Sequence, residues 1–376
     1  MRRLWKKPAL VLQFAVAFLC LVGWVLIFSA SGVMAGEQYG DSFYFLKKQV
    51  MWTLFGLAGF VFASRIPYFF IRNAARWIGL VCILALLLVY VPNLGMVKNG
   101  ARRWIGLFGL SLQPSEFVKI GLILYMAKFI SERHQRLVEL RRGVIPPLLV
   151  LGTACVLILL EPDFGSAVLI GSVGIVMLYM GGIRLVHLGL MSVSVMPFLY
   201  LLAWGAEYRR RRLLVFLRPW DDPMGDGFQV VQSLIALGTG GLHGLGIGGS
   251  VQKLYFLPYP YSDFIFAILG EETGLMGCCV VLGLYGVLVL AGFSIASRCP
   301  DLFGRLLVSG VVTLIALQAI IHAAVVAGML PTKGLPLPLI SFGGSSLVAT
   351  FIGLGLVMNV ARMERVIRDQ VPEMIR

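Results

Sequence analysis

The chain has 376 residues, of which 59% are hydrophobic and only 13% charged, and its mean hydropathy is +0.88. A soluble domain is about 45–50% apolar and about 25% charged, so this chain has too little polar surface for a water-soluble globule, and soluble enzyme folds are excluded. In a membrane protein, a net charge of +14 can reflect the orientation of the chain in the membrane, contact with anionic lipid headgroups or binding of an anionic substrate. Nucleic acid is the poorest candidate partner.

Ten apolar segments approach or exceed the roughly 20 residues that a membrane-spanning helix requires. The first follows a basic N-terminus but lacks a clear cleavage site, which favours a retained helix over a signal peptide. We therefore predict an all-α integral membrane protein that forms one polytopic domain over residues 1–376. The ten expected helices cover residues of about 9–31, 48–65, 76–92, 116–131, 145–160, 166–182, 186–205, 263–293, 306–328 and 345–361.

The distribution of Lys and Arg among the connecting segments predicts the orientation. Of the 32 Lys and Arg, 19 fall on the side of the N-terminus, and many of the others lie in a single long connection at about 206–262. Because short cytoplasmic loops carry the excess of positive charge, we expect both termini in the cytoplasm. Residues 206–262 then form an extracytoplasmic loop between helices 7 and 8, and residues 362–376 form a cytoplasmic tail.

The first polar motif on the outer side joins two arginines and a tryptophan to a helix start. Arginines beside a tryptophan at the membrane rim can hold a phosphate, although interfacial anchoring explains them equally well. Ser115 is a candidate N-cap and Glu116 suits the helix dipole, so capping alone could explain the helix start. The motif consists of Arg102, Arg103, Trp104, Ser115, Glu116 and Lys119.

The second motif is Glu161-Pro162-Asp163, a short connection between two helices. Its two carboxylates could bind a cation or a sugar hydroxyl. Pro-Asp-x-Gly is also ordinary turn chemistry, and we favour the turn.

The third motif is the long loop, which contains four successive arginines, Arg209 to Arg212, and ends at Asp263. Arginines on the outer side oppose the positive-inside tendency and indicate an anionic ligand, or else lipid headgroups. Asp263 lies at the membrane surface among aromatic residues and is either a reactive acid or a helix-start residue. Glu271 and Glu272 lie roughly 12–14 Å further along the helix. Because a carboxylate in the membrane costs at least about 2.5–3.5 kcal/mol, we expect them to face the bundle interior, paired with Lys119 or Arg102.

The fourth motif lies between the last two expected helices, where prolines and glycines cannot continue a helix. The free N–H groups and small hydroxyls at its end favour a phosphate or sugar site, and a re-entrant structural turn is an equal alternative. Its polar and small residues are Lys333, Ser341, Gly343, Gly344, Ser345 and Ser346.

Together these motifs resemble the SEDS family (shape, elongation, division and sporulation) of membrane-embedded glycosyltransferases, over about residues 99–360. Within the family, Arg218-Pro219-Trp220-Asp221-Asp222-Pro223 and the Thr332-Lys333 pair are most similar to the cell-division branch. The family's essential acid corresponds to Asp263. Tyr259 and Tyr261 replace a glutamate and a histidine that usually precede this acid.

The resemblance implies an inverting peptidoglycan glycosyltransferase that polymerises lipid II for the septal cell wall and releases undecaprenyl diphosphate. It implies ten spans, a bacterial inner-membrane location at the septum, and a class B penicillin-binding protein and other division proteins as partners. A divalent cation, Mg²⁺ or Mn²⁺, is a possible cofactor whose ligands are unknown. Asp263 is the expected general base, and Glu116, Glu161, Asp163, Glu271 and Glu272 are the supporting acids. The expected substrate-binding residues are Arg102, Arg103, Trp104, Lys119, Arg209, Arg210, Arg218, Gln232, Ser233, Lys253, Lys333, Ser341, Gly343, Gly344, Ser345 and Ser346.

Three alternatives stay open at this point. A lipid II flippase would need polar groups through the midplane, whereas the polar groups of this sequence collect at the outer rim. A polymerase of cell elongation would belong to the same family. A scaffold that only recruits division proteins would leave the charged outer motifs without a role.

Overall fold

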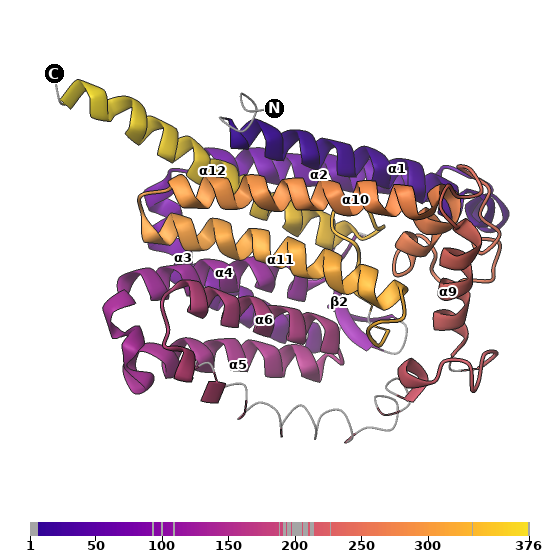
Figure 1. Ribbon diagram of the computed structural model, residues 1–376. Coiled ribbons are helices and arrows are strands. Elements are labelled where there is room, and N and C mark those ends of the chain that lie inside the picture. The colour runs from indigo at the N-terminus through magenta and orange to yellow at the C-terminus, as the bar shows by residue number, and fades with distance from the viewer. Residues whose placement is uncertain are drawn as a thin grey trace.

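The computed structural model describes most of the chain (Figure 1). The described residues are 7–91, 94–98, 101–107, 110–187, 189–190, 193, 197, 205, 210, 214–225, 227–332 and 334–374.

The structure is mainly helical. Its long helices lie side by side in layers, with α1, α2 and α10 along one side in Figure 1 and α5 and α6 along the other. The helices are α1 (Pro8–Tyr39), α2 (Tyr44–Arg65), α3 (Tyr68–Leu87), α4 (Pro114–Glu132), α5 (Ile145–Leu160), α6 (Phe164–Met180), α9 (Phe228–Gly240), α10 (Ile265–Arg298), α11 (Leu302–Val326) and α12 (Gly344–Met374).

Six helical stretches among the described residues are long and apolar enough to cross a membrane. They are Pro8–Tyr39, Tyr68–Tyr90, Leu140–Leu160, Ile265–Arg298, Leu302–Val326 and Gly344–Arg365. The chain is therefore a multi-pass membrane protein, and the finer count of ten spans stays a prediction. The expected seventh span, 186–205, lies mostly outside the described residues.

The boundaries of several helices differ from the sequence prediction. Helix α5 coincides with the expected 145–160, but α1 continues past the expected end at residue 31 to Tyr39, and α3 begins at Tyr68 rather than at residue 76. The expected loop 206–262 also contains a helix, α9, which packs against α10. An apolar run locates the part of a helix that lies in the membrane, but it does not mark where the helix ends. Helix boundaries therefore differ from the ends of the apolar runs.

A small sheet corrects the prediction of an entirely α-helical chain. Strands β1 (Gly95–Lys98), β2 (Ala101–Leu107) and β3 (Leu110–Leu112) pair antiparallel in the order β1-β2-β3. Gly95 permits the sheet to lie against the 3-10 turn that follows α3, Leu88–Tyr90, because a Cβ atom there would lie 1.9 Å from the carbonyl oxygen of Val89. Strands of three to seven residues are too short for a hydrophobic period to reveal them.

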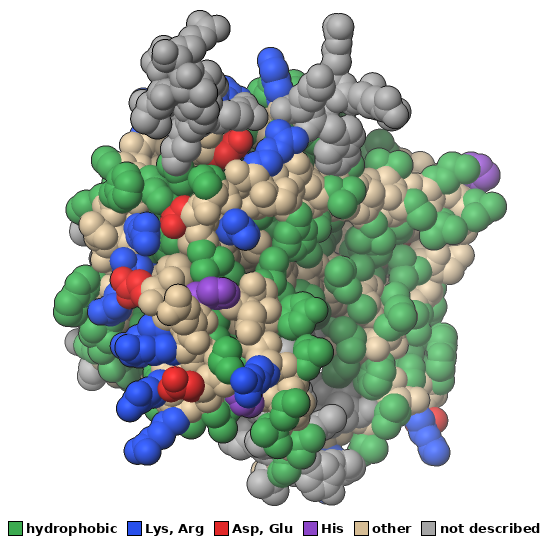
Figure 2. All heavy atoms as spheres, turned by 60° about the vertical axis from the view of Figure 1, so that its left-hand side comes forward, with side chains coloured by type: hydrophobic (Ala, Val, Ile, Leu, Met, Phe, Trp, Pro, Cys, Tyr) green, Lys and Arg blue, Asp and Glu red, His purple; other side chains and the backbone are tan. Residues whose placement is uncertain are grey.

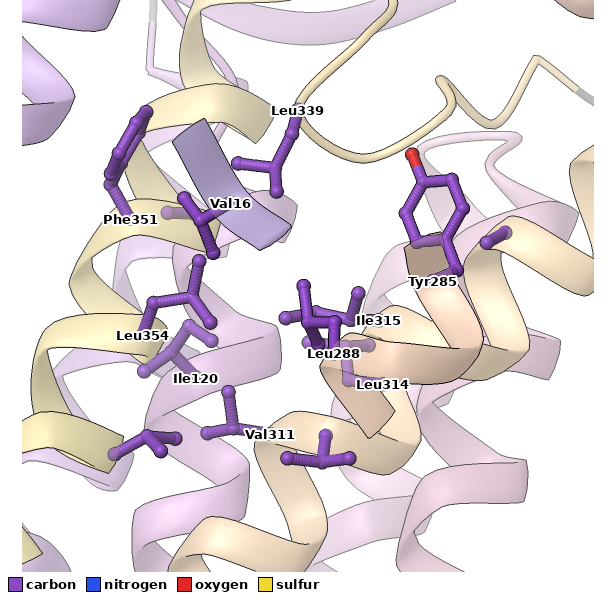
Figure 3. Packing of buried hydrophobic residues seen from close by; sticks show 14 of the residues in the cluster. Val16, Ile120, Tyr285, Leu288, Val311, Leu314, Ile315, Leu339, Phe351 and Leu354 are labelled. Atoms are coloured by element: carbon purple, nitrogen blue, oxygen red, sulfur yellow. The ribbon is translucent and has the colours of Figure 1, made fainter. Parts of the chain in front are cut away.

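Close helix contacts through small residues build the core. Helix α12 packs against α2, α1 against α10, and α10 against α11. At Gly56 of α2, a Cβ atom would lie 2.5 Å from the ring of Phe351 in α12. Such close packing replaces the hydrophobic driving force, which is absent between helices in lipid. Figure 3 shows the apolar side chains that meet between α1, α4, α10, α11 and α12, among them Val16, Ile120, Leu288, Val311 and Leu354.

One end of the bundle carries a cluster of exposed arginines. The end that carries the last turn of α4 and the link to α5 has exposed arginines at positions 133, 136, 141 and 142. Figure 2, which turns this end toward the viewer, shows Lys and Arg side chains gathered beside an apolar flank. This is the end for which the sequence predicts a cytoplasmic location. Asp263 lies at the opposite end, which we call the Asp263 end.

Candidate active site

Asp263 is partly buried in the turn that leads into α10, one residue before the N-cap Phe264. The segment 331–343 passes beside it, because a Cβ atom added to Gly334 would lie 3.4 Å from Oδ2 of Asp263. The fold therefore brings together two motifs from which the sequence predicts a catalytic acid and a phosphate or sugar site. Lys333, the cation of the fourth motif, lies outside the described residues.

The described part of the segment 331–343 is irregular, and buried side chains of α11 bind its carbonyl oxygens. Gln318 donates to the oxygen of Pro336 over 2.7 Å, and Nδ1 of His322 lies 2.8 Å from the oxygen of Leu335. These bonds satisfy buried carbonyl groups that no helix or strand pairs. Sequence reasoning missed Gln318, whose signal is a polar side chain within an apolar span.

Ser341 fastens this segment to the chain just before Asp263. Its Oγ accepts from the N–H of Leu337 (2.8 Å) and donates to the carbonyl of Ser262 (2.7 Å). The N–H of Phe342 donates to the carbonyl of Tyr261 (2.9 Å). The hydroxyl predicted to bind substrate is therefore engaged in fixing the turn that carries the acid.

Residues 343–346, the small residues at the start of α12, are packed against two other helices. The Oγ of Ser345 accepts from the N–H of Gln113, which precedes α4 (2.9 Å), and both serines are buried. At Gly344 a Cβ atom would lie 2.3 Å from Trp52. This packing supports the alternative of a structural turn over a direct substrate contact for these four residues.

Strand β2 places the first motif at the Asp263 end. Arg103 donates through Nε to the carbonyl of Glu161 (2.8 Å) and through Nη2 to the carbonyl of Pro162. Arg102 is exposed, and Trp104 is half-buried. Arg103 is thus hydrogen-bonded to the turn at residues 161–162. Arg102 is exposed, so a soluble or lipid-linked anion can reach it.

Glu161 is 1% exposed, and neither of its carboxylate oxygens has a hydrogen-bond partner among the described residues. Burial raises the pKa of this carboxyl to about 8; the charge of Asp163 adds to the rise, and the charge of Arg103 opposes it. A buried carboxylate without a partner is costly when ionised. Glu161 is therefore protonated in the folded protein at neutral pH.

Asp163 forms the turn that the sequence favours. It caps α6, since Oδ1 accepts from the N–H of Ser166 (3.1 Å), and Oδ2 accepts from Gln113 (3.3 Å). The expected cap at Ser115 is wrong: the N-cap of α4 is Gln113, with Pro114 as the first helical residue. Proline is favoured there because the first N–H of a helix has no partner in any case.

Lys119 and Glu116 form a buried ion pair one turn apart on α4, with Nζ 2.8 Å from Oε1. The lysine also lines a pocket between α4, α5, α6 and α11 whose other walls are apolar. The pairing satisfies both charges within one helix.

Glu271 and Glu272 are each 1% exposed, so they face the interior as expected. Their expected partners, Lys119 or Arg102, are wrong. Nζ of Lys253 lies 2.9 Å from Oε1 of Glu272 and is itself buried, because the long loop folds back against α10. Lys253, predicted to bind substrate, is an internal counter-ion.

The remaining predicted residues of the long loop differ in exposure and in their contacts. Arg210 and Arg218 are exposed, and Arg209 lies outside the described residues. Ser233 is buried in α9 and donates to a carbonyl oxygen of α11, while Gln232 beside it is half-buried. Ser233 thus anchors α9 to the bundle.

Most of the chain, including both motifs around Asp263, matches a known family. A family model that covers FtsW, RodA and SpoVE, described as "Cell cycle protein", matches residues 10–366. The chain belongs to this family. The resemblance to SEDS proteins is confirmed.

Several curated members of the FtsW/RodA/SpoVE family are similar over almost their full length. A protein of Geobacter metallireducens named "Probable peptidoglycan glycosyltransferase FtsW" is 44% identical over 351 residues, which are 93% of each chain. Stage V sporulation protein E of Bacillus subtilis is 40% identical over 362 residues, which are 96% of this chain and 98% of that protein.

Solved structures of the family have the same fold. One is a chain from a structure described as "Structural coordination of polymerization and crosslinking by a peptidoglycan synthase complex". It has a TM-score of 0.77 at 31% identity and covers 94% of this chain and 97% of its own. The rod shape determining protein RodA of Thermus thermophilus has a TM-score of 0.68 at 28% identity, with 93% and 95% covered.

The departure from the family pattern at Tyr261 has a structural counterpart. Its ring centroid lies 4.4 Å from that of Phe45 and 5.8 Å from that of Phe342, and the rings of Phe45 and Phe342 meet edge to face at 5.3 Å. Three aromatic side chains from three parts of the chain thus pack together two residues before the family's acid. Such contacts contribute about 0.5–1.5 kcal/mol per pair beyond burial.

The described residues do not form a preformed coordination site for a metal ion. Within the described part of the chain, no three His, Cys, Asp or Glu side chains come close enough to hold one. The carboxylate of Asp163 is bound by Gln113 and a backbone N–H, which leaves Glu161 alone in that turn. The described residues therefore do not fit a metal ion held by the protein alone.

Proposed function

We propose that this chain is a peptidoglycan glycosyltransferase that polymerises lipid II during septal cell-wall synthesis. The observation that carries the proposal is Asp263, a partly buried carboxylate at the start of α10 that faces the segment 331–343 across Gly334. The names of the family members in other bacteria support the reaction class.

In this proposal Asp263 is the general base. It accepts the proton of the acceptor's sugar hydroxyl as that oxygen forms a bond to the anomeric carbon of the donor, a role typically worth about 10²–10⁴-fold in rate. The bond from the anomeric carbon to the diphosphate oxygen breaks, and undecaprenyl diphosphate leaves with the electron pair. Attack opposite to the leaving group inverts the anomeric centre.

Cations at the Asp263 end would stabilise the departing diphosphate. Arg102 is exposed on β2, and Lys333 precedes Gly334 in the chain. Arginine binds phosphate oxygens with two parallel N–H groups, and lysine binds as a point charge. Mg²⁺ in phosphate sites is held largely by substrate oxygens and one or two carboxylates. Any divalent cation here would therefore arrive with the diphosphate.

The division role is favoured over elongation because the proteins named FtsW are 39–44% identical to this chain, whereas the solved RodA of Thermus thermophilus is 28% identical. A sporulation protein at 40% identity shows that identity alone separates the branches poorly. A flippase is disfavoured because the buried charges of the bundle, Lys119 with Glu116 and Lys253 with Glu272, are closed pairs.

We further propose a class B penicillin-binding protein as partner, together with other division proteins, in the inner membrane at the septum. The support is the solved relative, which comes from a complex of polymerization and crosslinking.

Reconstitution tests the function. Purified protein is incubated with lipid II and the cognate class B penicillin-binding protein, and glycan strands are separated on a gel. We expect strands with the wild type and none with Asp263→Asn. Strands that persist in the variant would refute the general base, and their absence in the wild type would favour transport or scaffolding.

A further inference from the structure

Helix α10 is broken nine residues after it begins. Gly274 has φ 65° and ψ −167°, which no helical residue adopts, so the helix consists of a short part, 265–273, and a long part, 275–298. A break of this kind frees carbonyl groups before it and N–H groups after it. In a membrane, such groups must be paired by the protein itself.

Residues 240–246 form hydrogen bonds with these groups. They comprise the last residue of α9 and the glycine-rich segment that follows it in the chain. The segment lies against the break and donates to the carbonyls on one side of it while accepting from the N–H groups on the other. The bonds are Leu245 N to Glu271 O (3.0 Å), Gly246 N to Glu272 O (3.0 Å), Leu275 N to Gly241 O (2.9 Å) and Met276 N to Leu242 O (3.2 Å).

Glycine is required for this close approach. A Cβ atom on Gly244, whose φ is 78°, would lie 2.2 Å from the carbonyl oxygen of Glu272, and one on Gly240 would lie 2.0 Å from that of Gly270. Both contacts are with backbone atoms, which cannot rotate away. The sequence pattern of repeated glycines after α9 is thus explained by backbone contact with α10.

The side chains of the two glutamates at the break bind the next stretch of the loop. The carboxylate of Glu271 accepts from the hydroxyl of Ser250 and from the N–H groups of Val251 (3.1 Å) and Gln252 (3.3 Å). Oε1 of Glu272 accepts from Nζ of Lys253 (2.9 Å).

Two further contacts join Lys253 to its own loop and Glu272 to α1. Nζ of Lys253 donates to the carbonyl of Gly248 (2.7 Å), and the hydroxyl of Ser29 in α1 donates to Glu272. Residues 250–253 are therefore fastened to the break by charge-assisted bonds, which are stronger than bonds between neutral groups.

These contacts close the chain into a hairpin, residues 250–272, with Asp263 at its tip. One arm runs from residue 253 to Asp263, and the other is the short part of α10. The two glutamates join the arms at the base of the hairpin. At the tip, the hydroxyl of Ser341 donates to the carbonyl of Ser262, and the N–H of Phe342 donates to the carbonyl of Tyr261. The position of the acid thus depends on two anchored ends.

We propose that Glu271 and Glu272 are positioning residues for Asp263, which hold the base of the hairpin so that the acid faces the segment 331–343. This inference rests on the proposed function. The two glutamates touch the loop and not the reacting atoms, so they act on turnover through Asp263.

The test compares the full-length variants Glu271→Gln and Glu272→Gln with the wild type. Hydrogen exchange read by mass spectrometry should become faster in residues 254–263 of each variant, by a factor at least tenfold larger than any change in α12. Turnover, kcat, should fall at least tenfold while KM for lipid II changes less than twofold, because a displaced acid slows chemistry and leaves substrate contacts in place. Ser250→Ala, which removes one donor to Glu271, should give smaller changes of the same kind if the glutamine variants fold poorly.

Glu132→Gln is the matched control. Glu132 pairs with Arg76 and Lys128 at the opposite end of the bundle, and its loss should change neither measurement. Unchanged exchange in 254–263, or faster exchange with unchanged kcat, would overturn the positioning role. An inactive wild type would refute the proposed function instead, and the exchange data would still decide whether the glutamates hold the hairpin.

Discussion

The ammonium group of Lys253 lies 2.9 Å from the carboxylate of Glu272, and the two side chains are 7% and 0% exposed. An ion pair buried to this degree is costly to form and more costly to break, since removing one partner leaves an uncompensated charge. The lysine comes from the long loop and the glutamate from α10, so the pair joins the loop to the bundle.

Breaking this pair should destabilise the protein strongly. Glu272→Gln leaves the ammonium buried, and we expect a loss of about 3–5 kcal/mol in the free energy of unfolding. Adding Lys253→Met to Glu272→Gln should recover most of that loss, because no buried charge remains. Thermal unfolding in detergent of both single variants and the double variant measures the coupling; purely additive losses would contradict it.

Asp263→Asn should lower kcat for glycan polymerisation by about 10²–10⁴-fold, because the amide cannot accept the proton of the acceptor hydroxyl. Its unfolding temperature should match that of the wild type, since the residue is partly exposed. Asp41→Asn is a control at an exposed acid that pairs with Lys47, and it should keep full activity. Normal activity of the Asp263 variant would disprove its assignment as the base.

The size of residue 334 should control access to the acid. A Cβ atom at Gly334 would meet Asp263 at 3.4 Å, an ordinary van der Waals distance. Gly334→Ala is therefore expected to retain activity within about threefold, whereas Gly334→Leu should raise KM for lipid II at least tenfold by filling the space in front of the carboxylate. Kinetics of the two variants test this, and equal activity would place the acceptor elsewhere.

Glu161 should make stability depend on pH. Its pKa is raised from an ordinary 4.5 to about 8 in the folded protein, so ionisation opposes folding. The protein should lose stability as pH rises from about 4.5 to 8 and lose no more above that range, with each unit of pKa shift worth about 1.4 kcal/mol at most. The variant Glu161→Gln should not show this loss, because it has no carboxyl group to ionise. Its free energy of unfolding should therefore exceed that of the wild type by a margin that grows between pH 5 and 8. A constant difference across that range would show that Glu161 is ionised throughout.

The sequence alone determined the membrane class and the family, because these depend on local features. A continuous apolar run such as 145–160 predicts a helix within the membrane without reference to other parts of the chain, and α5 has these bounds. The motif around Asp263 is contiguous in the chain and could be matched to a family pattern. The turn at Asp163 was also readable, since an aspartate caps the helix that follows it.

Only the tertiary structure decided which polar residues meet. Sequence reasoning assigns Lys253 to substrate and Glu272 to other partners, because nothing in sequence spacing indicates that a loop folds back onto a helix that follows it. The break at Gly274 and the contacts of Gly240 and Gly244 are likewise invisible locally, since an isolated glycine in an apolar helix is compatible with a straight helix. Burial forces every charge and every freed backbone group to find a partner, and the fold, not the spacing along the chain, determines which partners are within reach.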